Sequence, residues 1–399
     1  MTRASYKYSY DIHGIIRIQS ISKLPELGYF RVDQLTKPAD IVIDSSRPAN
    51  ISTATKSVHY DDGLGRLGFD INIDYTQPIA VTVSTLITLS PHVLYTNVVE
   101  PLLRWTFVQK GYALIHAACL SFDGKAVLVT AKTDTGKTST IILTAKNTPS
   151  CQFLSDDMTI VSSDGKVLSY PKPMTISFHT LRAAKTAPLP FLNRVALQIQ
   201  SRLHSKSGRK VGLTLGNSKF PAASLNSLVQ MIIPPPKYMI DRLVPGVKYV
   251  KSAKLNQVMV IERALDEEIK LNHDEIVQEL SVNAEDAYGF PPYPIIGHLL
   301  YTWDGKDLHT QERAIVSAAL EGCPARLVRS ANFGWWKRMP ELAGSAAKTE
   351  DTDQGISTVD SSMPTEPLQT NVTSHSKVGR KTCRWSGHQS SSRLPDAHH

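Results

Sequence analysis

Short runs of alternating apolar and polar residues dominate the first hundred positions, and this period of two predicts half-buried β-strands. The clearest runs are residues 15–18, 41–43 and 71–75, which are rich in isoleucine and are separated by glycine-containing turns. No catalytic set of side chains is visible among them. We therefore expect residues 1–96 to form a small β-rich N-terminal domain.

The apolar pattern then changes from a strand period to a helix period. Apolar side chains recur three or four residues apart between residues 99 and 107, and a glycine is expected to end the helix. Asn97 and Glu100 match a capping pair at its start. Arg104 and Lys110 fall on the other face of the helix, where we expect them to be solvated.

The next apolar run begins a strand, a loop and a helix. Residues 127–130 are apolar and β-branched, residues 131–136 suit a turn, and residues 137–143 suit a helix. A phosphate-binding loop requires this context, because backbone N–H groups of the loop and the helix N-terminus converge on phosphate oxygens. Lys137 can then reach the outer phosphates, and the Thr138 hydroxyl can ligate Mg²⁺.

Two positions depart from the pattern GxxxxGK[ST]. Ala131 stands at the first glycine, and Asp134 places a carboxylate where a triphosphate repels it unless the side chain points outward or contacts the metal. A Gly-Lys-Thr that merely opens an ordinary helix is the alternative. If the loop binds a nucleotide, the binding residues are Ala131, Lys132, Thr133, Asp134, Thr135, Gly136, Lys137, Thr138 and Ser139.

Two adjacent carboxylates, Asp156 and Asp157, follow a second predicted strand downstream of the loop. At the end of a strand, both side chains can reach a bound nucleotide and its substrate. One suits a Mg²⁺ ligand beside Thr138, and the other suits a base that accepts a proton from an attacking hydroxyl. An Asp-Asp turn or cap before the next strand, residues 158–161, is the alternative.

His116 ends an apolar run, residues 113–116, upstream of the loop. Asp123 and Gly124 predict a hairpin turn into the strand that feeds the loop, which would bring His116 near the same sheet edge. A lone histidine after an apolar run is usually structural. His116 therefore counts only together with the loop and the paired carboxylates.

The order of these features resembles the HPr kinase/phosphorylase family and its relative, phosphoenolpyruvate carboxykinase. Residues 115–118, 131–138 and 154–157 carry the likeness, which covers roughly residues 110–180. The resemblance implies an α/β (α+β) fold with a mixed-sheet P-loop kinase core of HPr kinase/phosphoenolpyruvate carboxykinase type. We expect this nucleotide-binding domain to span residues 97–343.

The same resemblance implies catalytic roles for Asp156, His116 and Lys137. Lys137 would contact the β- and γ-phosphates, Thr138 and Asp157 would hold Mg²⁺, Asp156 would be the base, and His116 would contact phosphate or substrate. The residues themselves do not decide which acid is the base and which is the metal ligand. Family members usually have glycine at the first loop position and often at the fourth, which bears on catalytic competence more than on the fold.

The rest of the chain carries fewer chemical signals. Residues 257–263 predict a further strand of the main sheet, and Asn272 and Thr310 are candidate caps of two helices. Trp335 is expected to cover apolar surface. The basic run at residues 202–210 is either a loop that contacts phosphate or, more commonly, a solvated loop.

Composition narrows the classes of function. The chain has 399 residues, of which 41% are hydrophobic and 20% charged, enough for two domains and a tail. The formal charge of +8 permits an anionic ligand such as ATP, but no long basic run interleaved with aromatics points to nucleic acid. Residues 344–399 are poor in apolar side chains and are expected to be a disordered tail. No apolar run could span a membrane and the four cysteines lack zinc spacing, so we expect a soluble cytoplasmic protein.

These inferences combine into an expected function. We expect an ATP-dependent phosphotransferase of HPr serine kinase type, with ATP and Mg²⁺ as cofactors and a protein serine or small-molecule hydroxyl as acceptor. The alternative is a regulatory protein that binds ATP without turning it over. Carboxykinase chemistry would need further basic and metal-binding residues that the sequence does not identify. The sequence leaves open the acceptor and the oligomeric state, a homo-oligomer included.

Overall fold

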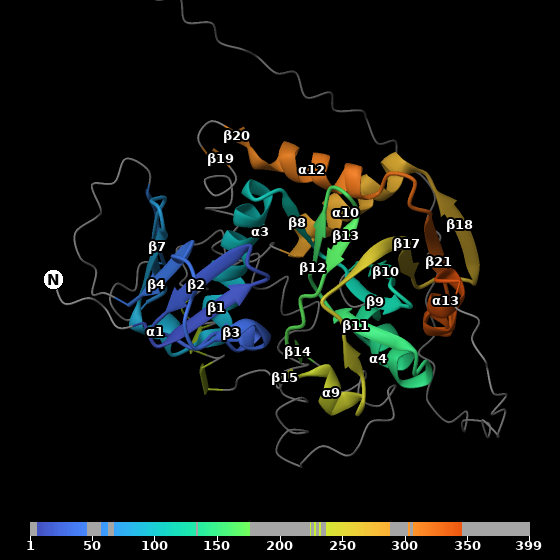
Figure 1. Ribbon diagram of the computed structural model, residues 1–399, viewed down its shortest axis with the longest axis horizontal. Coiled ribbons are helices and arrows are strands. Elements are labelled where there is room, and N and C mark those ends of the chain that lie inside the picture. The colour runs from blue at the N-terminus through green and yellow to red at the C-terminus, as the bar shows by residue number, and fades with distance from the viewer. Residues whose placement is uncertain are drawn as a thin grey trace, which may run out of the picture. The chain divides into compact units, whose positions relative to one another are not determined.

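Two mixed β-sheets, one of them curled into a half-barrel, make this a mixed α/β protein (Figure 1). The chain divides into two units, Met1–Lys348 and Thr349–His399, and all described residues belong to the first. The predicted domain boundaries near residues 96 and 343 stay predictions. The computed structural model describes residues 6–45, 57–62, 68–132, 135–175, 224, 227–228, 231–232, 237–287, 302–303 and 306–344.

The predicted N-terminal strands are confirmed as parts of a seven-stranded sheet. Its strands are β1 (Tyr8–Ile12), β2 (Ile16–Ser20), β3 (Arg31–Val32), β4 (Ile41–Asp44), β5 (Ser57–Asp61), β6 (Asp70–Asp74) and β7 (Ile79–Val83). The order is β3-β1-β2-β4-β7-β6-β5, with parallel pairing between β2 and β4 and between β4 and β7. Buried and half-exposed residues alternate strictly along these three strands, as a sheet with one face in the core requires.

Helical segments follow the sheet: α1 (Thr85–Thr88), α2 (Pro91–Leu94), the π-helix η3 (Tyr95–Val99) and α3 (Glu100–Gln109). The predicted helix is confirmed, and it packs between β2 and β8 (Tyr112–Ile115). The predicted capping pair is wrong, because the backbone is already helical at Asn97 and no side chain caps the start of α3.

Arg104 of α3 is buried, with 1% of its surface exposed, so the expectation that it is solvated is wrong. Its guanidinium donates to the two carboxylate oxygens of Glu312 at 2.7 and 2.6 Å and to Glu285 at 2.7 Å. The helix pattern could not show this, because Glu312 lies 208 residues further along the chain. Lys110, by contrast, is half-exposed and pairs with Asp40 at 2.9 Å.

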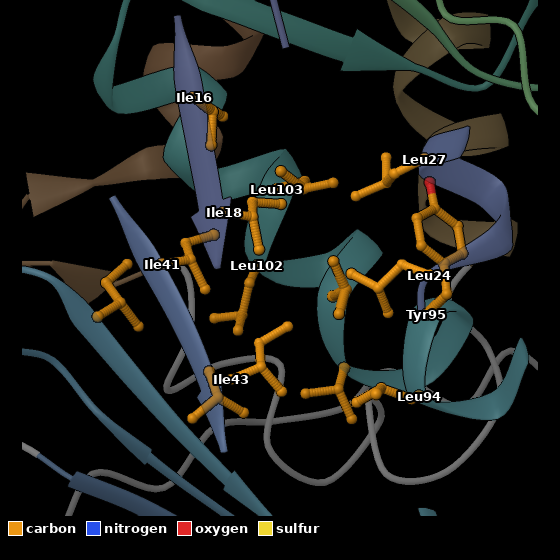
Figure 2. Packing of buried hydrophobic residues seen from close by; sticks show 14 of the residues in the cluster. Ile16, Ile18, Leu24, Leu27, Ile41, Ile43, Leu94, Tyr95, Leu102 and Leu103 are labelled. Atoms are coloured by element: carbon orange, nitrogen blue, oxygen red, sulfur yellow. The ribbon is translucent and has the colours of Figure 1, made fainter. Parts of the chain in front are cut away.

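One apolar core joins the N-terminal sheet to the helices and to the second sheet. It includes Leu114, Ile160 and Leu308, which lie beyond α3 in the chain. Burial of apolar surface, at roughly 25 cal/mol per Å², is the main force that holds these elements together. Figure 2 shows part of the cluster, with Ile16, Ile18, Leu24, Leu27, Ile41, Ile43, Leu94, Tyr95, Leu102 and Leu103 labelled.

The second sheet has ten strands and carries the predicted loop. They are β8, β9 (Ala118–Phe122), β10 (Lys125–Thr130), β11 (Cys151–Ser155), β12 (Thr159–Ser162), β13 (Lys166–Leu168), β16 (Lys248–Tyr249), β17 (Ser252–Glu262), β18 (Glu267–Leu271) and β21 (Ala325–Arg329). The main order is β16-β11-β9-β10-β17-β13-β12-β8, and β21, which carries β18, also pairs with β17. The predicted strand at residues 257–263 is therefore confirmed as β17, which runs parallel to β10.

The hairpin predicted at Asp123 and Gly124 is confirmed. Both residues have positive φ, 51° and 81°, as a tight two-residue turn between β9 and β10 requires. β10 and β11 both run antiparallel to β9, so their carboxyl ends and the start of β9 share one edge of the sheet. This loop edge, as we call it, receives His116, the chain after Thr130 and the chain after Ser155.

The C-terminal helices confirm one predicted cap and correct another. Asn272 and Glu275 exchange hydrogen bonds of 2.9 and 2.8 Å at the start of α10 (His273–Ala287), as a capping box does. At α12 (Leu308–Ala319) the cap is Asp307, whose side chain accepts from the backbone N–H of His309 at 3.0 Å. Thr310 instead donates its hydroxyl to Asp307 at 2.6 Å.

The remaining elements complete the described chain. The basic run at residues 202–210 and the tail beyond Gly344 lie outside the described residues. None of the described helices is long and apolar enough to cross a membrane. The other elements are η1 (Pro25–Phe30), α4 (Lys137–Asn147), β14 (Met174–Thr175), β15 (Lys237–Tyr238), α9 (Ile240–Leu243), β19 (Thr302–Trp303), β20 (Lys306–Asp307) and α13 (Trp335–Leu342).

Candidate functional site

The predicted strand, loop and helix are present as β10, residues 131–136 and α4. Ala131 is buried, whereas Lys132 is exposed, and Thr133 and Asp134 lie outside the described residues. α4 begins directly after Gly136, and none of the described side chains caps its N-terminus. Within the described chain, the first backbone N–H groups of α4 are therefore not taken up by a capping side chain, which is the state that an anion-binding helix start needs.

The second half of the loop is held by aromatic residues that the sequence did not connect with it. Gly136 has a φ of +134°, and a Cβ added there would lie 3.2 Å from the ring of Trp335 and 3.5 Å from that of Phe333. Arg263 donates from Nε to the carbonyl of Thr135 at 2.8 Å, and its guanidinium lies 4.6 Å from the Phe333 ring centroid. Trp335 thus covers apolar surface, as predicted, and also explains why the loop needs a glycine at this position.

Asp156 is the buried member of the acid pair, with 4% of its surface exposed. The Thr138 hydroxyl donates to its Oδ2 at 3.1 Å, while Oδ1 has no hydrogen-bond partner within the described part of the chain. Burial raises the pKa of Asp156 to about 7, and the Asp157 carboxylate adds to the rise, while Lys137 and Thr138 oppose it. Asp156 can therefore exchange a proton near neutral pH.

Asp157 is the less buried member of the pair, with 40% of its side chain open to solvent, and three basic side chains approach its carboxylate. Lys172 Nζ lies 2.7 Å from Oδ2, and His116 Nε2 and Lys137 Nζ lie 3.0 and 3.8 Å from Oδ1. Burial alone would raise the pKa of Asp157, but Lys172, His116 and Lys137 hold it well below its ordinary value. Asp157 is therefore a permanent anion in this setting.

His116 lies between β8 and β9, at the loop edge, where the sequence predicted it. Its Nδ1 lies 3.1 Å from the backbone oxygen of Asn283 on α10, and its carbonyl accepts from the Thr130 hydroxyl at 3.2 Å. Asn283 Nδ2 in turn donates to the same Thr130 hydroxyl at 3.1 Å. The ring is thus oriented from its far side and presents Nε2 to the acid pair.

Lys137 is the least satisfied cation of the site. Its side chain is only 12% exposed, and within the described residues its Nζ makes no hydrogen bond. Burial lowers the pKa of the Lys137 ammonium, and the two aspartates oppose this only in part. A buried ammonium without hydrogen bonds costs free energy that an anionic ligand can recover.

Sequence reasoning missed Lys172 and Glu100, which extend the site inward. Lys172 Nζ lies 2.7 Å from Glu100 Oε2, and both side chains are about 10% exposed or less. Burial alone would lower the pKa of Lys172, but Asp157 and Glu100 raise it above its ordinary value. A lysine between two prolines at residues 171–173 was a weak signal, and Glu100 was assigned to a cap.

A groove of about 460 Å³ borders the loop at Lys132 and Thr135. Its walls come from β17, β18, β21 and α10, with Val260, Leu271 and Leu327 as apolar lining. Glu279, which also lines it, accepts a hydrogen bond from Asn283 at 3.2 Å. A ligand in this groove would therefore lie beside the loop and beside Glu279, which contacts the residue that orients His116.

The donor set bears on metal binding. Among the described residues, no group of three or more histidine, cysteine or carboxylate side chains is arranged to hold a metal ion. Thr138 and Asp156 could still supply two oxygen ligands, which is the usual protein contribution to a Mg²⁺ that is mainly held by phosphate and water.

Neither protein-family models nor curated proteins yield a match to this chain. The likeness to HPr kinase/phosphorylase therefore rests on the residues quoted above, and the case for a function rests on the geometry of the site.

Proposed function

We propose that the protein is an ATP-dependent phosphotransferase, with a P-loop kinase core of HPr kinase type built on its second sheet. The observation that carries this proposal is the convergence at one sheet edge of Lys137, Thr138, the acid pair and His116. These groups lie up to 41 residues apart in the chain, as His116 and Asp157 do. Phosphoryl transfer depends mainly on positioning and charge stabilisation, which this set can supply.

The unsatisfied atoms of the site fit Mg-ATP. Lys137 Nζ and Asp156 Oδ1 are buried without hydrogen bonds within the described chain, and the start of α4 has no side-chain cap. A phosphate group would accept hydrogen bonds from Lys137 Nζ and from the backbone N–H groups at the start of α4. A hydrated cation or an acceptor hydroxyl would satisfy Asp156 Oδ1. Bound Mg²⁺ would neutralise phosphate charge and help to orient the terminal phosphoryl group.

The charge balance of the site supports a requirement for a divalent cation. Lys137 and Lys172 are already opposed by Asp157 and Glu100 at short range. A triphosphate brings several further negative charges, which the loop amides and Lys137 cannot fully offset. We therefore propose that ATP binds with Mg²⁺ and only weakly without it.

The contacts favour the reverse of the role division that the resemblance implies. Thr138 donates to Asp156 and not to Asp157, so Asp156 is the acid next to the hydroxyl expected to ligate Mg²⁺. Asp157 is the acid that reaches solvent, where an acceptor hydroxyl would arrive. In this division Asp156 and Thr138 would hold the metal, and Asp157 would orient the acceptor by accepting a hydrogen bond from its hydroxyl.

The second candidate is a regulatory protein that binds ATP without turnover. The substitution of glycine by Ala131 at the first loop position motivates it, because a Cβ there restricts the close approach of backbone to phosphate. The two candidate functions use the same ATP-binding site, and they differ only in whether the γ-phosphoryl group is transferred to an acceptor.

Binding and single-turnover measurements test the proposal. Mg-ATP should raise the melting temperature of the wild type and leave that of Lys137→Met unchanged, and γ-labelled ATP with a host lysate should yield a labelled product. Loss of labelling in Asp157→Asn, with Mg²⁺ binding retained, would support the reversed division. Absence of Mg-ATP binding by the wild type would rule out both candidates, and binding without any labelled product would leave the regulator.

A further inference from the structure

The carboxylate of Asp157 occupies a position that resembles a bound anion. Lys172 lies on the chain after β13, His116 between β8 and β9, and Lys137 at the start of α4, yet all three approach the same carboxylate. The distances of 2.7 and 3.0 Å to Lys172 and His116 are those of charge-assisted hydrogen bonds, whereas Lys137 at 3.8 Å is too far to make one. The carboxylate therefore makes hydrogen bonds with only two of the three basic side chains.

His116 can donate from both ring nitrogens in this arrangement. Its Nδ1 faces the carbonyl oxygen of Asn283 at 3.1 Å, and its Nε2 faces a carboxylate oxygen of Asp157 at 3.0 Å. Both partners can only accept, so a ring that makes both bonds carries an N–H on each nitrogen. The same Nε2–H could donate to a phosphate oxygen without any change of the ring.

The three cations are held in place by groups other than Asp157. Glu100 binds Lys172 at 2.7 Å from inside the protein, Asn283 holds His116, and the backbone of α4 fixes Lys137. Asp157 itself lies in the turn after β11 and has 40% of its side chain in solvent. The three basic side chains therefore have anchors other than Asp157, and Asp157 is the most exposed side chain of the cluster.

We propose that Lys137, Lys172 and His116 form an oxyanion site for a phosphoryl group or free phosphate, and that Asp157 is its built-in counter-ion, displaced when the ligand binds. This inference rests on the proposed function and deepens it, because it names the ligand chemistry of one part of the site and adds Lys172 to it. A tetrahedral phosphate is larger than a carboxylate and has more acceptor oxygens, so it can also satisfy Lys137 Nζ.

The proposal predicts a change in metal-free phosphate affinity that a residue acting only as a metal ligand would not produce. Removing the charge of Asp157 removes the competitor of the anion, so metal-free phosphate should bind more tightly to Asp157→Asn than to the wild type. We expect about a tenfold gain, equivalent to about 1.4 kcal/mol. A residue that acts only through Mg²⁺ would leave metal-free binding unchanged.

Titration calorimetry with inorganic phosphate, in the presence of a chelator and without divalent cations, tests this prediction on the full chain. The variants are Asp157→Asn, the double variant Asp157→Asn with Lys172→Met, and Asp123→Asn as a control. Asp123 lies in the exposed turn between β9 and β10, so the control makes the same change of net charge away from the site. Its positive φ of 51° also suits asparagine.

The expected result is a gain in Asp157→Asn, its loss in the double variant and no change in Asp123→Asn. Equal affinity in the wild type and Asp157→Asn, or an equal gain in the control, would overturn the proposal. If Asp157→Asn does not fold by circular dichroism, Asp157→Ser replaces it with the same expectation. If Asp157→Asn gains phosphate affinity but the protein does not bind Mg-ATP, the oxyanion site stands and the proposed function is rejected. If the protein binds Mg-ATP but Asp157→Asn gains no phosphate affinity, the proposed function stands and the oxyanion site is rejected.

Discussion

The cluster around Arg104 and the cluster around Asp157 both bury charged side chains near α3, but they treat those charges differently. Arg104 meets the carboxylates of Glu312 and Glu285 with three hydrogen bonds of 2.6 to 2.7 Å. Around Asp157, Lys137 Nζ and Asp156 Oδ1 have no hydrogen bond within the described chain. A buried cation that meets carboxylates at hydrogen-bond distance holds elements together, whereas a buried cation without such a partner, as Lys137 is, suits an anion that is not part of the chain.

The two buried lysines of the site show the same contrast at the level of single residues. Lys172 has two carboxylates at 2.7 Å, and they raise its pKa despite its burial. Lys137 has no carboxylate within hydrogen-bond distance in the described chain, and burial lowers its pKa. The fold therefore supplies Lys172 with anionic partners, whereas the Lys137 ammonium is left to be paired by an anionic ligand.

The largest effect on folding is expected from Arg104→Met, which leaves Glu312 as a buried carboxylate without its partner. Breaking a buried pair in this way should lower the free energy of unfolding by about 3–5 kcal/mol. Urea denaturation measures it, with Lys110→Met as the control. Lys110 pairs with Asp40 at the surface, so its loss should cost about 1 kcal/mol or less. Equal losses in the two variants would remove the basis for calling the Arg104 cluster structural.

Asp156→Asn should raise the free energy of unfolding, by a smaller amount that depends on pH. The pKa of Asp156 in the folded protein is about 7, above its ordinary value near 4, so the folded state binds more protons than the unfolded state between these values. The contribution of Asp156 to stability is therefore present at low pH and is lost as the pH rises toward 7. At pH 8 the asparagine variant should be more stable by on the order of 3 kcal/mol.

Urea denaturation between pH 4 and pH 8 measures this difference. The wild type should lose stability relative to Asp156→Asn as the pH rises from 4 to 7, and the difference between the two proteins should level off by pH 8. A difference between the proteins that does not vary with pH would show that Asp156 is not held in a pKa-raising environment.

The smallest effect on stability is expected from Lys137→Met, although the residue is buried. The variant loses no hydrogen bond to a described residue and removes a charge that burial disfavours, so the free energy of unfolding should change by about 1 kcal/mol or less. Lys172→Met should cost clearly more, because Glu100 is then buried without its partner. Thermal unfolding of the two variants sharpens the contrast, and equal destabilisation would contradict it.

Local sequence signals predicted those parts of the site that depend on neighbours in the chain. The turn at Asp123 and Gly124, the start of α4 after Gly136 and the capping box of Asn272 each follow from residues within a few positions of one another. The order of strand, loop and helix placed Lys137 and Thr138 correctly at the helix start. Such features are decided by local backbone preferences and local hydrogen bonds.

The signals failed where the deciding partner is distant in the chain. Arg104 was expected in solvent because its helix face looked polar, yet Glu312 lies 208 residues away. Glu100 was expected to cap a helix, yet its carboxylate binds Lys172, which is 72 residues away. The spacing of apolar residues around Arg104 and Glu100 is the same whether the charged side chain is exposed or is buried against a partner that is distant in the chain.

The sequence by itself determined the strands, the loop and the kinds of side chain that could bind phosphate, because those depend on period, turn chemistry and residue type. Only the tertiary structure decided which cations surround which acid, that Thr138 contacts Asp156, and that Lys172 belongs to the site. The physical reason is that ionic contacts need atoms within about 4 Å of one another, and only the pairing of distant strands brings these side chains that close.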